Sequence, residues 1–195
     1  MFKSKEYWEN RYKIGQTSGN GSYGFLAEYK SEFINNYITE NNITSLLEYG
    51  CGDGNQLSYI KCQKIIGADV SQTAIDKCKS LIPNGEFICL DNTEFPDTKT
   101  DLLLSLDVIY HLIEDDVYED YINNIVNHGS KHVIIYSANF DGNEGFARHV
   151  KPRNFTEHKN LQEKYELINI VKNKYPSTDH TKGSFSDWYI FKLKK

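Results

Sequence analysis

The stretch Leu46-Leu47-Glu48-Tyr49-Gly50-Cys51-Gly52-Asp53-Gly54 decides the fold of this chain. Its leucines and the preceding Ile43 form a short apolar run that is typical of a buried strand. The three glycines at alternate positions then predict a sharp turn, because a residue without a Cβ tolerates unusual backbone angles and lets a ligand approach closely. The helical spacing of residues 55–60 predicts that the turn ends on the exposed N–H groups of a helix N-terminus.

The spacing of these glycines excludes two common uses of such a turn. A phosphate-binding loop needs Lys-Ser or Lys-Thr after its last glycine, and neither pair follows Gly54. A dinucleotide-binding loop needs Gly-x-Gly-x-x-Gly, which this stretch lacks, so a nicotinamide-dependent oxidoreductase is disfavoured. A glycine turn that binds no ligand remains an alternative.

The pattern Glu-x-Gly-x-Gly-x-Gly from Glu48 to Gly54 resembles motif I of the class I S-adenosylmethionine-dependent methyltransferases, which have a Rossmann-like fold. The resemblance implies S-adenosyl-L-methionine as the cofactor and S-adenosyl-L-homocysteine as its product. Specific motifs carry it over residues 44–112, and only the order of elements carries it elsewhere. It assigns to the cofactor site Glu48, Tyr49, Gly50, Cys51 and Gly52.

Length, charge and hydropathy narrow the class of protein. The 195 residues fit one domain spanning 1–195, and the formal charge of -5 with a pI near 5.7 argues against a nucleic-acid partner. The chain has neither a run of about 18 apolar residues nor the apolar region of a signal peptide, so we expect a cytoplasmic protein without a membrane partner. None of its four cysteines forms a Cys-x-x-Cys pair, which favours reduced thiols. The oligomeric state is not predicted.

Residues 1–42 are expected to form a helical lid. A helix over residues 5–12 places Trp8, Arg11 and Tyr12 on one side, where they either pack in the core or, as the resemblance implies, lie at the cofactor. A glycine-rich loop over residues 14–24 follows, and it is longer than a usual link between helices. Its Tyr23 is assigned to the substrate.

Two further strands end in acids. The strand Lys64–Asp69 places Asp69 and its neighbour Val70 where a carboxylate accepts hydrogen bonds from ribose hydroxyls, although Asp69 could instead cap the following helix, residues 72–81. A strand over residues 86–90 ends in Asp91-Asn92, the point where the family binds adenine. A simple turn is the alternative for this pair.

The strand Asp101–Asp107 is nearly all apolar, as a central parallel strand should be. The resemblance places its end, with Leu106, beside the transferred methyl group and assigns Tyr110 to the acceptor. Asp107 and His111 are the candidate catalytic residues, because a neutral histidine can act as a general base. A packed, hydrogen-bonded histidine is the alternative.

Alternating strands and helices predict an α/β fold with a parallel sheet and right-handed crossovers. The later elements are a helix over residues 114–127 and strands over residues 131–137, 165–174 and 186–193. The resemblance implies a Rossmann-like three-layer sandwich, whose seven-stranded, mostly parallel sheet has helices on both faces and an antiparallel final strand between the fifth and sixth. The acids and the glycine turn are expected at the carboxyl ends of the strands.

Residues 138–157 read as a substrate loop with clustered basic side chains. Arginine binds carboxylate or phosphate at two points, so Arg148, His149 and Arg153 are predicted to hold an anionic acceptor. A solvated loop paired to surface acids is the alternative. No metal is expected, because Asp91-Asn92 alone does not make a metal-binding cluster.

The chain also resembles small bacterial methyltransferases that modify surface polysaccharides such as capsule. This resemblance implies O-methylation of a small-molecule or glycan-precursor substrate, anionic or sugar-like, for example a phosphorylated or phosphoramidate precursor. The alternatives are another small metabolite, a protein acceptor, or an inactive module that binds S-adenosylmethionine without turnover.

Overall fold

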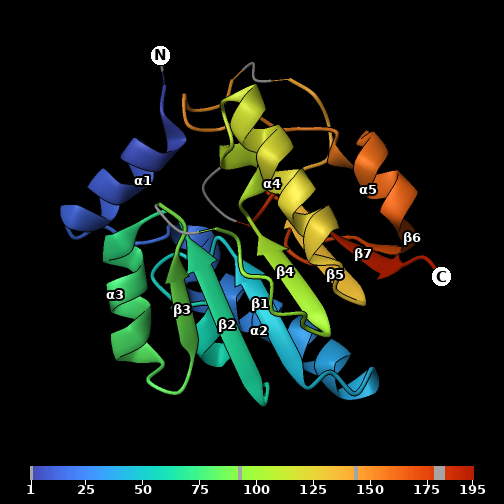
Figure 1. Cartoon of the computed structure of the whole chain (residues 1–195). Helices are drawn as coiled ribbons and strands as arrows, with labels where there is room; N and C mark the ends of the chain where they lie inside the picture. Colours follow the sequence, from blue (N-terminus) through green and yellow to red (C-terminus); the bar gives the residue numbers. More distant parts are fainter. Residues whose placement is uncertain (1, 92–93, 143–144, 178–182) are drawn as a thin grey trace. The chain divides into compact units, whose positions relative to one another are not determined.

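A computed structural model describes residues 2–91, 94–142, 145–177 and 183–195 of the chain (Figure 1). Its seven strands have the order β3-β2-β1-β4-β5-β7-β6. Two compact units make up the chain, and we describe each by itself. We call Lys5–Pro96 with Thr100–Leu102 the N-terminal unit, and Met1–Ser4, Asp97–Lys99 and Leu103–Lys195 the C-terminal unit.

Three parallel strands form the centre of the N-terminal unit. They are β1 (Ser45–Tyr49), β2 (Lys64–Asp69) and β3 (Glu86–Cys89). The apolar run ahead of the glycines is buried as predicted, since Leu46 and Leu47 are completely inaccessible in β1. Helix α3 (Gln72–Leu81) packs against β2 and β3. It begins at Ser71, whose Oγ accepts a hydrogen bond from the backbone N–H of Ala74 at 3.1 Å.

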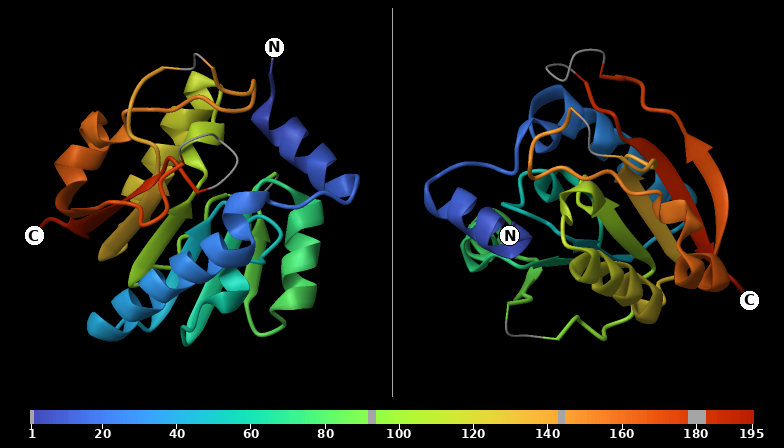
Figure 2. Two further views of the ribbon diagram at one scale, coloured as in Figure 1. Left: turned by 180° about the vertical axis from the view of Figure 1, so that it is seen from behind. Right: turned by 90° about the horizontal axis from the view of Figure 1, so that it is seen from above.

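Two helices precede β1 in the sequence, as predicted. Helix α1 (Ser4–Lys13) is followed by the loop that contains the short 3-10 helix η1 (Asn20–Ser22), and then by α2 (Gly24–Glu40). The latter buries an apolar stripe that includes Ala27 and Ile34. In Figure 1 it lies behind the strands of this unit, and the back view in Figure 2 brings it to the front.

The prediction of a helix over residues 55–60 is wrong. Only the 3-10 helix η2 (Leu57–Tyr59) forms there, after a single wider turn in which Ser58 N–H donates to Gly54 O at 2.9 Å. Ile60 has extended backbone angles and ends the segment. A few residues of 3-10 helix align few peptide dipoles, so the glycine turn does not end on the N-terminus of a regular helix.

The C-terminal unit contains the remaining strands. They are β4 (Leu102–Leu106), β5 (His132–Ser137), β6 (Tyr165–Val171) and β7 (Asp187–Leu193). As predicted, β7 lies between β5 and β6 and runs antiparallel to both, with Ile134 opposite Ile190 and Leu167 opposite Phe191. Trp188 of β7 is completely buried, and its ring lies 4.4 Å from that of Tyr136 on β5.

Helices and short turns complete this unit. Helix α4 (Asp115–His128) ends at Gly129 in the left-handed region, and α5 (Lys159–Lys164) contacts both α4 and β6. Figure 1 shows these two helices on the same side of strands β5 and β7. The 3-10 helix η3 (Ile109–His111) follows β4, and the 3-10 helix η4 (Phe155–Glu157) precedes α5. Sequence periodicity did not predict α5, which is short.

The predicted α/β class, the seven-stranded sheet and its antiparallel final strand are confirmed. The assignment of residues 1–195 to one domain stays a prediction. Within the described ranges, no helix combines the length and the hydropathy that a bilayer crossing requires.

Replacing Gly54 by alanine is expected to destabilise the chain more than replacing Gly15. Both glycines have φ near +80°, but a Cβ on Gly54 would lie 2.9 Å from Cys78 Sγ, whereas a Cβ on Gly15 meets nothing within 4 Å. Left-handed strain costs about 1–2 kcal/mol in each variant, and Gly54→Ala adds about 1–3 kcal/mol for displacing Cys78. Urea unfolding measures both changes, and equal losses in the two variants would contradict the packing argument.

Candidate active site

Three glycines in the left-handed region build the turn after β1. Gly50, Gly52 and Gly54 have φ of 82°, 56° and 80°. The N–H groups of Gly50 and Cys51 both donate to Ala68 O on β2, at 2.7 and 3.2 Å. A Cβ on Gly52 would lie 2.9 Å from the Tyr12 hydroxyl and would also collide with Ser18. Glycine is therefore required here by the backbone angles and by the chain's own side chains.

Asp69, the last residue of β2, holds this turn in place. One carboxylate oxygen accepts from Gly52 N–H at 2.9 Å and the other accepts from Ser71 N–H at 2.9 Å. Only 8% of the residue is exposed, and this burial raises the pKa of the carboxyl to about 6, although the backbone hydrogen bonds oppose the shift. Each carboxylate oxygen accepts more than one hydrogen bond, so acceptor capacity is left for a ligand.

A second acid of the turn, Asp53, ties it to the loop after α1. Its Oδ2 accepts from the N–H of Ser18 at 3.0 Å and from the hydroxyl of Tyr23 at 2.9 Å. Ser18 Oγ in turn accepts from Asp53 N–H at 3.0 Å and lies 3.0 Å from the Tyr12 hydroxyl. Tyr23, predicted to bind substrate, thus lies on the glycine turn within the N-terminal unit.

Helix α1 is fastened to the start of α3 by Glu9. Its carboxylate accepts from Ser71 Oγ at 2.5 Å and from Thr73 Oγ1 at 2.9 Å. Burial alone would raise the pKa of Glu9, but these hydrogen bonds, with Lys13 close by, lower it to about 2. The sequence reasoning missed this residue, because nothing in its local pattern distinguishes it from a solvated helix charge.

The aromatic side of α1 combines packing with cation–π contacts. The rings of Trp8 and Tyr12 lie 6.0 Å apart, and the guanidinium of Arg11 lies 5.7 Å from the Trp8 ring. Arg11 Nε also donates to Thr17 O at 2.7 Å. Tyr12 is buried and its pKa is raised, first by burial and then by Asp69 and other nearby groups. These contacts place Tyr12 beside the glycine turn, whereas Arg11 contacts the following loop.

The other predicted cofactor residues of this unit have diverse surroundings. Glu48 is buried at the end of β1, and the ring of Tyr49 lies 4.5 Å from that of Phe95. The carbonyl of Val70 accepts a weak hydrogen bond from Cys89 Sγ. Asp91 forms an ion pair with Lys5 of α1, and Asn92 lies outside the described residues. Leu106, in the C-terminal unit, is buried at the end of β4.

In the C-terminal unit, Asp107 follows β4 with a left-handed φ of 59°, which is rare for a residue other than glycine. Its N–H donates to Tyr136 O at 2.8 Å, and its Oδ1 accepts from the buried Ser186 Oγ at 2.9 Å. Burial, the negative charge of Asp107 and a hydrogen bond to it raise the pKa of Tyr110 well above its ordinary value. Ser186 also hydrogen-bonds the Tyr110 hydroxyl and is a site residue that sequence reasoning missed.

The two predicted histidines lie together. His111 Nδ1 is 2.7 Å from the carbonyl oxygen of His149, and the two rings stack with their centroids 5.5 Å apart. A carbonyl oxygen only accepts, so Nδ1 of His111 is the donor and Nε2 carries the lone pair of the neutral ring. His111 therefore has the tautomer that a general base requires at Nε2.

Aromatic rings surround Tyr110. The Phe185 ring lies 4.9 Å from it and 5.4 Å from the Phe146 ring, and Phe140 lies 6.1 Å from Phe146. Phe140 is 43% exposed. Phe140 and Phe146 belong to the predicted substrate loop, whereas Phe185 lies two residues before the start of β7. This group of rings offers apolar faces next to the carboxylate of Asp107 and the hydroxyl of Ser186.

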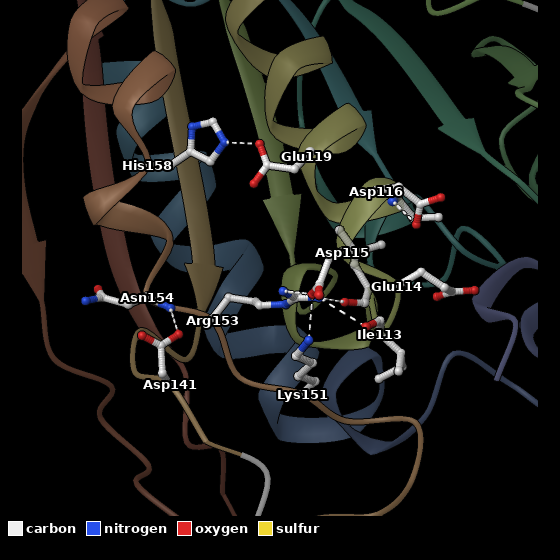
Figure 3. Close-up of polar contacts among 12 residues, drawn as sticks. Ile113, Glu114, Asp115, Asp116, Glu119, Asp141, Lys151, Arg153, Asn154 and His158 are labelled. Carbon is white, nitrogen blue, oxygen red and sulfur yellow. Dashed lines mark hydrogen bonds and ion pairs between the residues drawn. The ribbon is translucent and has the colours of Figure 1, made fainter. Parts of the chain in front are cut away.

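The structure gives Arg153 a structural place instead of a ligand-binding one. Its guanidinium donates to Asp115 Oδ1 at 2.5 Å and to the carbonyls of Leu112 and Ile113 at 2.8 and 3.1 Å (Figure 3). It also lies 4.6 Å from the centre of the Tyr118 ring. The anion-binding role predicted for Arg153 is not supported by these contacts, because the donors point at internal acceptors. Arg148, in contrast, is exposed.

Replacing Arg153 by methionine is expected to lower the free energy of unfolding by about 2–4 kcal/mol, because the carbonyls of Leu112 and Ile113 then lose their hydrogen bonds from the guanidinium. Arg148→Met, at an exposed position of the same loop, should change it by no more than about 0.5 kcal/mol. Urea denaturation followed by circular dichroism measures both. Comparable small losses would mean that Arg153 does not support the loop.

This chain is similar to a known protein family in sequence and to known structures in fold. Residues 47–134, which begin in the glycine-turn motif and end in β5, match the family model of a methyltransferase domain. No curated protein sequence matches the chain. Among the described residues, no group of three or more His, Cys, Asp or Glu side chains is placed to hold a metal ion.

Solved methyltransferase structures share the fold at low sequence identity. The N-methyltransferase NodS from Bradyrhizobium japonicum WM9, in complex with S-adenosyl-l-homocysteine, has a TM-score of 0.72 and 16% identity, covering 98% of this chain and 99% of that one. Magnesium protoporphyrin IX methyltransferase (ChlM) from Synechocystis PCC 6803, with bound S-adenosylmethionine, has a TM-score of 0.64 and 13% identity, covering 100% of this chain and 99% of that one. The methyltransferase domain of bacterial CtHen1 has a TM-score of 0.64 and 18% identity, covering 85% of this chain and 98% of that one. The chain therefore has the Rossmann-like methyltransferase fold, and residues 47–134 carry the match to a methyltransferase domain.

Proposed function

We propose that this chain is an S-adenosylmethionine-dependent methyltransferase that methylates an oxygen atom of a small anionic or sugar-like acceptor, such as a capsular polysaccharide or its phosphorylated or phosphoramidate precursor. The observation that carries the proposal is the arrangement around Asp107. There, a carboxylate and two hydroxyls lie beside a group of aromatic rings. Sugars present apolar C–H faces and hydroxyls together, which match aromatic rings next to hydrogen-bonding groups.

The cofactor would be held by the glycine turn and by Asp69. When bound, S-adenosylmethionine supplies an electrophilic methyl group on its sulfonium, so the chain itself needs only to bind, align and deprotonate. Asp69 fits a ribose because it is buried beside the glycine turn, and its two carboxylate oxygens can accept hydrogen bonds from vicinal hydroxyls in addition to those from the backbone. The left-handed glycines carry no Cβ at the end of β1, and at the half-buried Gly50 a ligand would be able to approach the backbone closely.

Roles for the remaining predicted residues follow from their contacts. Asp91 would accept from the adenine amino group, although it must then share its carboxylate with Lys5. Trp8, Arg11 and Tyr12 would belong to the helical lid over residues 1–42, which the hydrogen bonds of Asp53 and Glu9 fasten within the N-terminal unit. Localisation in the cytoplasm belongs to the same proposal.

Deprotonation of the acceptor is assigned to Asp107 and His111. His111 exposes the basic tautomer at Nε2, because Nδ1 donates to the carbonyl of His149. Asp107 is oriented by Ser186 and would hydrogen-bond the acceptor hydroxyl. Tyr110 has a raised pKa, mainly because it is buried, so its hydroxyl stays protonated and can only orient Asp107 or the acceptor.

An anionic group on the acceptor would be recognised by Arg148, since Arg153 is occupied by Asp115 and two carbonyls. The acceptor is to be found with tritiated S-adenosylmethionine and a panel of neutral sugars, uronic acids, sugar phosphates, phosphoramidates and amines. Label transfer to anionic sugars supports the proposal. Transfer to amines alone, or to no compound while the cofactor binds tightly, would contradict it.

Arg148→Ala is expected to raise the KM for an anionic acceptor about tenfold while leaving kcat and the affinity for S-adenosylhomocysteine unchanged, because an exposed charge pair contributes about 1–1.5 kcal/mol to binding. Steady-state kinetics measure the first two quantities and calorimetry the third. Lys159→Ala, at an exposed position on α5, is the matched control for loss of a positive charge. An unchanged KM in Arg148→Ala would remove this residue from the acceptor site.

The affinity for S-adenosylhomocysteine is expected to fall as the pH drops through about 6. Burial raises the pKa of Asp69 to about 6, so below this pH the carboxyl is protonated and loses an acceptor site for the ribose. Calorimetry of the wild type between about pH 5 and pH 8 measures this dependence. Asp69→Asn should bind weakly with no such dependence, whereas Asp76→Asn, at an exposed position on α3, should retain it.

A flat wild-type profile would count against the ribose role of Asp69. Loss of the pH dependence in Asp76→Asn would point instead to a general charge effect of the carboxylates near α3.

A further inference from the structure

Two cysteines meet directly beneath the glycine turn. Cys51 lies between Gly50 and Gly52, and Cys78 lies on the buried side of α3. Their sulfur atoms are 3.8 Å apart, and both residues are buried, with 5% and 0% exposure. They are separated by 27 positions in the sequence, so their proximity is a product of the fold.

The surrounding atoms keep the two sulfurs facing each other. Cys78 Sγ donates to the carbonyl of Gly52 at 3.2 Å and lies 2.9 Å from where a Cβ on Gly54 would be. On its other side, Cys51 Sγ lies 3.0 Å from the Cβ position of Gly67 on β2. Both thiols are therefore confined by backbone that glycine alone allows to approach so closely.

We infer that Cys51 and Cys78 are a modification site, at which an oxidant of the peroxide or disulfide class forms an intramolecular disulfide that weakens binding of the adenosyl cofactor. With hydrogen peroxide, one thiol is oxidised to a sulfenic acid and releases one water. The second thiol attacks that sulfur, and a second water leaves. In total, two thiols and one peroxide give one disulfide and two waters.

The coupling to the cofactor runs through Gly52. A disulfide has an S–S bond of about 2.05 Å, so the sulfurs must approach each other by nearly half their present separation. This movement removes the thiol that donates to Gly52 O and pulls on the Cys51-Gly52 peptide. The N–H of Gly52 is one of the backbone donors to Asp69, so the displacement disturbs the carboxylate proposed to hold the ribose.

The reduced thiols react slowly with oxidants. The hydrogen bond between Cys51 and Cys78, together with burial, raises the pKa of the Cys51 thiol, and a thiol reacts far more slowly than a thiolate. Oxidation therefore requires opening of the turn. By linkage, a ligand that binds only the intact turn must also slow the oxidation.

The test uses the full chain with Cys62→Ser and Cys89→Ser, which leaves only the buried pair, and a matched control that carries Cys78→Ser in addition. Both proteins are treated with hydrogen peroxide, with and without S-adenosylhomocysteine. Thiol titration and intact mass give the oxidation state, peptide mapping gives the linkage, and calorimetry gives the affinity before oxidation, after it and after reduction by dithiothreitol.

We expect a loss of about 2 Da with a Cys51–Cys78 linkage, an affinity for S-adenosylhomocysteine that falls by about tenfold or more and returns on reduction, and slower oxidation in the presence of the ligand. The control should keep its thiol and its affinity. Two thiols that stay free in folded protein, or a disulfide that leaves the affinity unchanged, would overturn the inference. If the reduced protein does not bind S-adenosylhomocysteine, the proposed role of the glycine turn in cofactor binding is contradicted. This outcome is measured before any oxidation.

Discussion

The carboxylate of Asp69 is the interaction on which the N-terminal unit depends. It accepts from Gly52 in the glycine turn and from Ser71 at the start of α3, so one side chain fixes the ends of two connections. An acceptor-only group is needed, because both neighbours present N–H donors that no strand or helix satisfies. Keeping a carboxylate in so buried a place is unfavourable, which is why its pKa is raised to about 6 although hydrogen bonds oppose the shift.

The same unit uses polar contacts where an ordinary core would use apolar ones. Asp53 joins the turn to Ser18 and Tyr23, and Glu9 joins α1 to the residues that begin α3. Each contact is a hydrogen bond to a charged acceptor. Such a bond is strong and directional, but it contributes little to stability once one partner moves away. Such contacts would suit the lid proposed for residues 1–42, because local opening is easier where polar contacts rather than buried apolar side chains hold a segment.

Much of the fold was predictable, because its signals are local. The apolar run ahead of Gly50 and the apolar strands each carry their own pattern, and the place of the antiparallel final strand between the fifth and sixth followed from the family resemblance. The helix after the glycine turn was not predictable, since residues 55–60 have helical spacing but too little length to keep a regular helix. The contacts of Arg153 were not predictable for a related reason. Its type and its neighbours suggest an anion, whereas its real acceptors are Asp115 and two distant carbonyls.

The residues proposed for the cofactor and those proposed for the acceptor differ in how they are assembled. Many of the residues proposed for the cofactor are held by contacts among neighbouring strands and loops, and Glu48 to Gly52 belong to one continuous motif. Asp107, in contrast, is held in its left-handed conformation by Tyr136 and by Ser186, which is 79 positions away. Phe146 and Phe185, which complete its surroundings, also come from separate segments. A site built from such remote pieces can change one ring or one charge without disturbing the others. For this reason the acceptor of a methyltransferase is inferred from the arrangement of side chains in the folded structure, whereas its cofactor can be inferred from a short sequence motif.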